Sequence, residues 1–299
     1  DTTMLVSVGV DIGSSTTHLV FSHVKMEHRD GRFVVADRSV MFESDIFLTP
    51  YVDDDTIDAK ALGDFIALQY GWAQLTPDDI DTGALILTGI AVRQKNARAI
   101  GELFSLETGK FVSVSAGDHL ETAMAAHGSG AVVNSGLAGV TVMNIDMGGG
   151  TSKIAICDHG EVVDLTAVDI GARLIALHED GRVARIEEAG KRFAGELGLE
   201  LSVGQSPPEG ALEALADSMA DRLVEISGRG NLAPETEALL RLPALHWEGA
   251  IDAVTFSGGV SEYLYGYEQT DYGDLGLLLA RAVRERVEAS GVRIMESVE

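Results

Sequence analysis

Cysteine is nearly absent from this sequence, since Cys157 is the only one among 299 residues. A single cysteine excludes an intrachain disulfide and favours a reducing compartment, so we expect a cytoplasmic protein. Cys157 follows an apolar run, where we expect a buried and unreactive thiol. Proline is also scarce, with 6 residues, while glycine is abundant, with 34. This combination is typical of an α/β protein with many turns after strands.

The sequence also contains few basic residues. It has 22 lysines and arginines against 47 aspartates and glutamates, which gives a net charge of −25. Nucleic acids and anionic membranes bind through clustered basic residues, so this balance argues against both as partners. No apolar run reaches the roughly 18 residues that a membrane-spanning helix needs, and we see no export signal at the N-terminus.

What the chain does have is a glycine-rich hairpin sequence, IDMGGGTSKIAI, at residues 145–156. An apolar strand ends at Asp146, the glycines at 148–150 turn the backbone, and Thr151 precedes a second strand. Glycines lack a Cβ, so consecutive backbone N–H groups can converge on one anionic ligand. The carboxylate before them is placed to hold a divalent cation, through water, against the phosphates of that ligand.

The same design occurs a second time, in VDIGSSTTHLVF at residues 10–21. Without a gap, Asp11, Gly13 and Thr16 match Asp146, Gly148 and Thr151. The two copies lie 135 positions apart, a spacing that is too long for a solenoid and that suits two half-domains. We therefore predict a first domain at residues 1–139 and a second at 140–299, with a phosphate ligand held between the halves.

Several further segments bear on the site or on the fold. A small-residue helix is expected after Gly117, and the segment at residues 251–256 is expected to form a buried strand that stops at Ser257, Gly258 and Gly259. Helices are also expected at residues 184–198 and 211–226. His18 and Lys153 occupy equivalent places beyond the two turns, and we interpret both as residues on strand surfaces.

The ordered motifs VDIGSSTT, NIDMGGGTSK and VTFSGGVSEYL resemble the phosphate and adenosine motifs of the actin-like ATPase superfamily. This resemblance implies an α/β fold of two duplicated ribonuclease-H-like domains with mixed sheets flanked by helices. It implies ATP and Mg²⁺ as ligands, with Asp11 and Asp146 as the metal-binding and catalytic carboxylates. The nucleotide contacts that it implies are Gly13, Ser14, Ser15, Thr16, Gly148, Gly149, Gly150, Thr151, Ser257, Gly258 and Gly259.

A polar residue near the connecting helix would orient the attacking water. Asp118, His119 and Glu121 compete for this role, and their spacing does not decide among them. Heat-shock ATPases use a glutamate near this helix, so we name Glu121 as the candidate catalytic residue.

Within the superfamily the sequence is most similar to the ethanolamine ammonia-lyase reactivating factors. Besides the two hairpins, the segments that carry this similarity are ALILTGIAVRQKNA, SAGDHLETAMAAHGSGAV and DIGARLI. The resemblance implies an ATP-dependent chaperone that lets damaged cobalamin in ethanolamine ammonia-lyase be exchanged for intact cofactor, in the cytoplasm or in association with a bacterial microcompartment. The D-x-H-x-x-G cobalamin pattern is absent, so we expect no direct cobalamin ligation. Members of this family are longer than this chain, so we expect its second domain to be truncated at the C-terminus.

Two other functions on the same fold remain open. A small-molecule kinase would need a carboxylate base opposite the γ-phosphate, and the sequence offers no convincing candidate. An actin-like assembly protein would need matched polymer surfaces, which a sequence does not reveal. Phosphate release without added substrate, phosphate transfer to a sugar, and concentration-dependent polymerisation distinguish the three.

Overall fold

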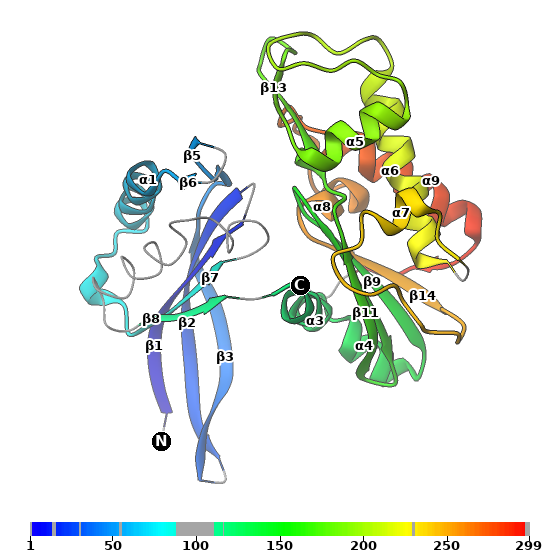
Figure 1. Cartoon of the computed structure of the whole chain (residues 1–299). Helices are drawn as coiled ribbons and strands as arrows, with labels where there is room; N and C mark the ends of the chain where they lie inside the picture. The colour runs from blue at the N-terminus through cyan, green and yellow to red at the C-terminus, as the bar shows by residue number, and fades with distance from the viewer. Residues whose placement is uncertain are drawn as a thin grey trace. The chain divides into compact units, whose positions relative to one another are not determined.

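In the computed structural model the chain folds into two units, Asp1–Gly117 and Asp118–Glu299, each built around a mixed β-sheet (Figure 1). The structure describes residues 2–13, 16–29, 31–53, 56–87, 111–115, 117–228 and 231–296. The helix expected after Gly117 belongs to the second unit, whereas the sequence placed the boundary near Gly139. It does so because buried Ala126 of this helix packs with Val142, Ala155 and Cys157 of the second sheet.

The strands of the first unit are β1 (Thr2–Ile12), β2 (Thr16–Arg29), β3 (Arg32–Glu43), β4 (Phe47–Leu48), β5 (Tyr51–Asp53), β6 (Thr56–Ile57), β7 (Thr82–Leu87) and β8 (Phe111–Ser115). Its described helices are α1 (Ala59–Trp72) and the 3-10 turn η1 (Pro77–Asp79). The sheet order is β3-β2-β1-β7-β8, with β4 beside β2. Apolar residues of β1 alternate with others, and Val8, Val10 and Ile12 form a core with Leu62 and Ile66 of α1. Asp58 begins α1 by accepting hydrogen bonds from two backbone N–H groups of its first turn.

The strands of the second unit are β9 (Thr141–Met147), β10 (Ser152–Asp158), β11 (Glu161–Val168), β12 (Ile175–Leu177), β13 (Val183–Ile186), β14 (Ala253–Ser257) and β15 (Arg293–Ile294). Its helices are α3 (Asp118–Gly128), α4 (Ala131–Ala138), η3 (Ala172–Leu174), α5 (Glu188–Glu196), α6 (Ala211–Ser227), α7 (Pro234–Glu237), α8 (Gly259–Tyr265) and α9 (Gly276–Ser290). The expected helix at 211–226 is confirmed as α6. The one at 184–198 is wrong in its first turn, which is strand β13.

The second sheet has the order β11-β10-β9-β14-β15. In both units three antiparallel strands are followed by two parallel ones, so the two sheets repeat one topology. Met143, Ile145 and Met147 face the larger core beneath α6, α8 and α9, while the opposite face lies under α3 and α4 (Figure 1). This repetition confirms the expected duplicated α/β fold with mixed sheets flanked by helices.

Candidate functional site

Both glycine-rich segments form hairpins with the same register. Asp11 lies opposite His18 in the β1–β2 ladder, and Asp146 lies opposite Lys153 in the β9–β10 ladder. These pairs are separated by the same 135 positions as the sequence repeat. The duplication therefore extends from the sequence to the strand pairing.

The two turns are closed by equivalent backbone hydrogen bonds. The Gly13 N–H donates to the Thr16 carbonyl at 2.8 Å, and the Gly148 N–H donates to the Thr151 carbonyl at 3.0 Å. Of the residues predicted for the first turn, Ser14 and Ser15 lie outside the described part of the chain.

A buried hydroxyl holds the first turn in place. Thr49, which is 4% exposed, donates to the Gly13 carbonyl at 2.8 Å, and its oxygen lies 3.1 Å from the hydroxyl of buried Thr17. Asp11 at the end of β1 is exposed.

Backbone contacts hold the second turn. Ala172 N–H donates to the Gly148 carbonyl at 3.0 Å, and Arg173 N–H donates to the Gly149 carbonyl at 2.6 Å. Gly171 approaches so closely that a Cβ there would lie 2.4 Å from the Gly149 oxygen. Only glycine lets the chain after β11 pack against the turn in this way.

The second turn presents donors beside a carboxylate. Within the described residues, the N–H groups of Gly149, Gly150 and Thr151 have no hydrogen-bond acceptor, and Asp146 makes no side-chain hydrogen bond or ion pair. Asp146 and the two glycines are partly exposed. Adjacent N–H groups suit a phosphate, and a carboxylate oxygen suits a hard cation such as Mg²⁺, so the donor set fits a metal-bound phosphate.

The end of β14 completes this edge of the second sheet. Ser257 pairs with Asp146 across the parallel ladder. Gly258 has a positive φ of 80°, and a Cβ there would lie 2.6 Å from Asp146 Oδ1. Gly258 thus allows the chain to pass directly beside this carboxylate. Gly259 follows as the first residue of α8.

Asn144 was not predicted as a site residue, but it is a buried polar residue on the same strand and the same face of the sheet as Asp146. Asn144 is fully buried; its amide nitrogen lies 3.2 Å from the Ser257 hydroxyl, and its oxygen accepts from the Thr255 hydroxyl at 3.0 Å. Buried amides are costly unless bonded, and here both ends of the side chain are bonded. The network fixes the end of β14 relative to β9.

The three candidates for orienting water differ in their surroundings. Asp118 Oδ1 accepts from Arg241 Nε at 3.0 Å, and His119 is exposed. Glu121 forms an ion pair with Lys153 through Oε1. Lys153 was expected on a strand surface and is instead buried, at 7% exposure, because α3 packs on β10.

Arg241 binds two carboxylates from different segments. It is buried and also donates from Nη1 to Asp169 Oδ1 at 2.9 Å. Burial lowers the pKa of Arg241, but the hydrogen bonds that it donates to the Asp169 and Asp118 carboxylates outweigh this effect, so the pKa is raised. The arginine therefore ties the start of α3 to the segment after β11, which supports the second turn.

A second buried ion pair connects that turn to α9. Arg173 Nε donates to Asp274 Oδ2 at 3.0 Å, and Asp274 Oδ1 accepts from the Gly276 N–H at 2.7 Å. Burial, followed by the negative charge of Asp274, raises the pKa of nearby Tyr263. The sequence contains the residues of this pair, but nothing in their spacing indicated that they meet.

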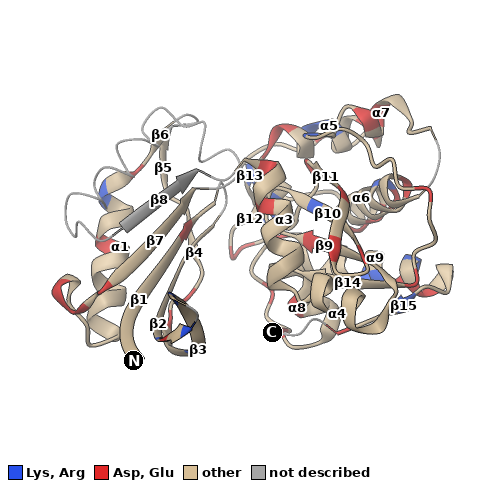
Figure 2. Ribbon diagram, turned by 90° about the horizontal axis from the view of Figure 1, so that it is seen from below, with Lys and Arg blue, Asp and Glu red and all other residues tan. Residues whose placement is uncertain are grey.

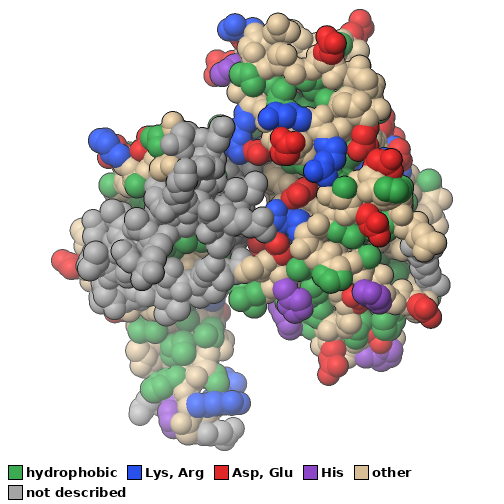
Figure 3. Space-filling model, in the orientation of Figure 1, with side chains coloured by type: hydrophobic (Ala, Val, Ile, Leu, Met, Phe, Trp, Pro, Cys, Tyr) green, Lys and Arg blue, Asp and Glu red, His purple; other side chains and the backbone are tan. Residues whose placement is uncertain are grey.

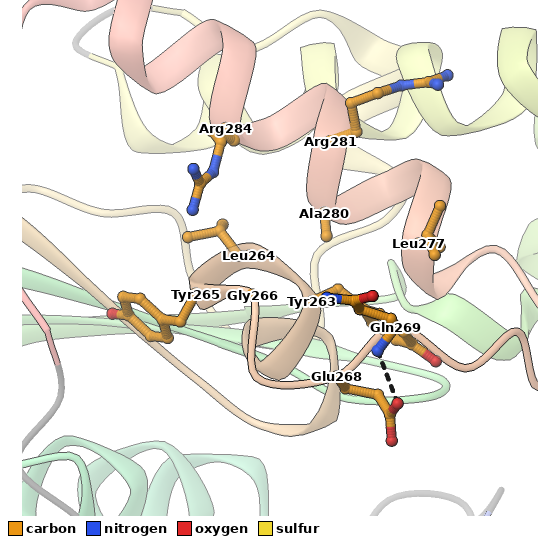
Figure 4. Close-up of a pocket in the computed structure, with 10 residues that line it drawn as sticks. All are labelled: Tyr263, Leu264, Tyr265, Gly266, Glu268, Gln269, Leu277, Ala280, Arg281 and Arg284. Carbon is orange, nitrogen blue, oxygen red and sulfur yellow. Dashed lines mark hydrogen bonds between the residues drawn. The ribbon is translucent and has the colours of Figure 1, made fainter.

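A shallow pocket lies at the other end of α8, away from Ser257–Gly259 (Figure 4). Tyr263, Tyr265 and Glu268 line it from the end of α8 and the loop after it, and Arg281 and Arg284 line it from α9. It is separated from the candidate site by the length of α8.

Charged residues of both signs occur in the described structure, as the composition of 22 basic and 47 acidic residues leads one to expect. Basic residues alternate with acidic ones along the ribbon (Figure 2), and basic and acidic side chains are interspersed on the face that Figure 3 shows. Among the residues that the structure describes, no helix combines the length and the apolar character that crossing a membrane requires.

Comparisons with known structures support the fold. A Ppx/GppA family member from Aquifex aeolicus matches 99% of this chain and 94% of its own, with a TM-score of 0.55 and 13% identity. An exopolyphosphatase-like protein covers 97% of this chain and 88% of its own, with a TM-score of 0.51 and 12% identity. These likenesses show the fold alone, which is that of the actin-like ATPases.

Sequence comparisons identify the family. The model of the family described as "Ethanolamine utilisation protein EutA" matches residues 3–299. The "Ethanolamine ammonia-lyase reactivase EutA" of Salmonella typhimurium is 33% identical over 95% of this chain, and that of Escherichia coli is 32% identical over the same share. This chain spans 62% of the length of both relatives. The chain therefore belongs to the EutA family of ethanolamine utilisation proteins.

Proposed function

We propose that this chain is the nucleotide-binding part of an ATP-dependent reactivating factor for ethanolamine ammonia-lyase. Family membership and the name of the two bacterial relatives support this reading. The factor promotes exchange of damaged cobalamin for intact adenosylcobalamin on the partner enzyme. It works in the cytoplasm, either free or in association with a bacterial microcompartment.

The observation that carries the nucleotide part of the proposal is the second turn. Three backbone N–H groups without an acceptor, at 149–151, adjoin the Asp146 carboxylate, which is likewise without a protein partner in the described chain. These donors bind phosphate oxygens of ATP. Asp146 and, by the sequence repeat, Asp11 supply carboxylates for Mg²⁺, which neutralises phosphate charge when bound.

The remaining predicted residues have separate roles in nucleotide binding and hydrolysis. Gly13, Ser14, Ser15 and Thr16 form the other phosphate cradle. Ser257, Gly258 and Gly259 meet the adenosine part, where the absence of side chains on the two glycines allows a close backbone approach. Glu121 orients the water. Phosphoryl transfer depends mainly on positioning and charge neutralisation, so these parts are enough for slow hydrolysis.

A reactivation assay tests the proposed function. Ethanolamine ammonia-lyase inactivated with damaged cobalamin is mixed with the protein, Mg-ATP and fresh adenosylcobalamin, and deamination is followed alongside phosphate release. We expect recovery with ATP and none when a nonhydrolysable analogue replaces it. Hydrolysis without recovery would overturn the reactivase function and leave an ATPase. Phosphate transfer to a sugar would favour a kinase, and concentration-dependent polymers would favour an assembly protein.

A further inference from the structure

Glu121 and Lys153 form a buried ion pair at the edge of the second sheet. The side chain of Lys153 is 9% exposed and that of Glu121 is 17% exposed, so both charged groups are largely withdrawn from water. Charges are buried at a high cost in free energy unless they are paired with good geometry. The stability of the fold alone therefore does not explain why these two charged side chains are buried here.

The strand register places Lys153 in a polar row with the candidate site. Lys153 lies opposite Asp146, and Asp146 lies opposite Ser257, so the three residues share one face of the sheet. Further along the same face, Val142, Ala155 and Cys157 form an apolar cluster under α3 and α4. The charged residues of this face thus occur at the end that carries the turn.

The two oxygens of Glu121 have different surroundings. Oε1 is bound by Lys153, whereas Oε2 is buried and has no hydrogen-bond partner among the described residues. A buried carboxylate oxygen without a hydrogen-bond donor is energetically unfavourable, so it favours binding of a water or of a ligand donor. Asp118 is bound to Arg241 and His119 is exposed, so neither offers a comparable group.

We propose that Lys153 is a positioning residue, which holds Glu121 through Oε1 so that Oε2 accepts a hydrogen bond from the hydrolytic water. This inference rests on the proposed function. The water oxygen forms a bond to the γ-phosphorus, and the bond from that phosphorus to the β–γ bridging oxygen breaks, with its electron pair remaining on ADP. The water proton passes to Glu121 and then to the released phosphate.

The test compares Lys153→Met with Lys153→Arg, Glu121→Gln and the double variant Lys153→Met/Glu121→Gln. General-base residues contribute roughly 10²- to 10⁴-fold, so we expect kcat for ATP to fall about a hundredfold in Glu121→Gln. In Lys153→Met we expect about a tenfold fall or more, with the KM for ATP within about twofold of wild type. Lys153→Arg should recover part of the loss, and the double variant should be no slower than Glu121→Gln.

The matched control is Lys60→Met, which removes a lysine from an exposed pair with Asp64 in α1. It should keep the wild-type rate. Circular dichroism and thermal unfolding check each variant, and Lys153→Gln, whose amide still donates a hydrogen bond, replaces Lys153→Met if that protein does not fold. A wild-type kcat in the Lys153 variants, a raised KM with unchanged kcat, or additive losses in the double variant would overturn the positioning role. Absence of turnover in wild type would instead overturn the proposed ATPase function, and this inference with it.

Discussion

The two hairpins of this molecule have the same backbone pairing and differ in the side chains that follow the turn. Each has an aspartate one residue before the end of its first strand, closes its turn with a glycine N–H, and returns with the same register. Beyond the first turn, His18 lies 3.2 Å from Glu43 of β3, with side chains that are 30% and 61% exposed. At the equivalent place beyond the second turn, Lys153 is buried against Glu121.

This difference shows how a duplicated backbone acquires separate roles. The strand–turn–strand pattern sets the positions of the carboxylates and the turn, because register follows from the pairing. The covering element sets the environment of the next side chain. In the second unit α3 packs over β10 and brings a glutamate to Lys153, while His18 has as its partner a residue of a neighbouring strand.

The strongest test of the comparison replaces each aspartate in turn. If both hairpins serve Mg-ATP, Asp11→Asn and Asp146→Asn should each reduce ATP hydrolysis by about a hundredfold or more, because an amide does not neutralise a cation. Turnover is measured against Mg²⁺ concentration, with the exposed Asp78→Asn as control. Loss in one variant alone would limit the function to that hairpin, and full activity in both would refute the site.

A smaller effect is expected from the support of the second turn. A Cβ in Gly171→Ala would lie 2.4 Å and 2.5 Å from the oxygen and carbon of Gly149, which are backbone atoms with little freedom to move. We expect the free energy of unfolding to fall by about 1–3 kcal/mol, measured by urea denaturation, together with weaker nucleotide binding. Gly195→Ala, at an open position inside α5, should instead be neutral or stabilising. Equal stability of the two variants would contradict the close packing of Gly171.

The first turn depends on a hydroxyl, so Thr49→Val is the corresponding test there. The substitution keeps the shape but removes the donor to the Gly13 carbonyl and the contact with Thr17. A lost buried hydrogen bond costs about 1–2 kcal/mol, and we expect the loss of stability to be smaller than in Gly171→Ala. The reverse order would show that the first turn is the more rigidly supported of the two.

The smallest effect concerns Cys157, which stands where the first copy has Ser22. Burial raises the pKa of the Cys157 thiol to about 11. The folded protein should therefore react with a maleimide far more slowly at pH 8 than the urea-unfolded chain, whose thiol ionises near its ordinary pKa. Because the pKa of the Cys157 thiol is higher in the folded than in the unfolded protein, the thiol lowers the stability of the fold only as the pH rises from about 8.5 towards about 11. Equal labelling rates in both states would show that the thiol is accessible.

Much of the fold and part of the site follow from local sequence patterns. The two aspartate–glycine turns, the strands around them and the helix α6 were predicted from apolar alternation, glycine runs and helical spacing. The first turn of the expected helix at 184–198 is strand β13 instead, because Val183–Ile186 pairs with β12 and the helix begins only at Glu188. Short segments of mixed pattern take the structure that their tertiary partners favour.

By itself the sequence determined the duplicated hairpins, the acidic composition and the family, because these depend on neighbouring residues and on an ungapped repeat. Only the tertiary structure decided which carboxylate near the connecting helix has an unpartnered oxygen. That choice depends on contacts between distant segments, such as Arg241 with Asp118, 123 positions apart, and Lys153 with Glu121. Burial and ion pairing arise from the packing of α3 on the sheet, and spacing along the chain does not encode them locally.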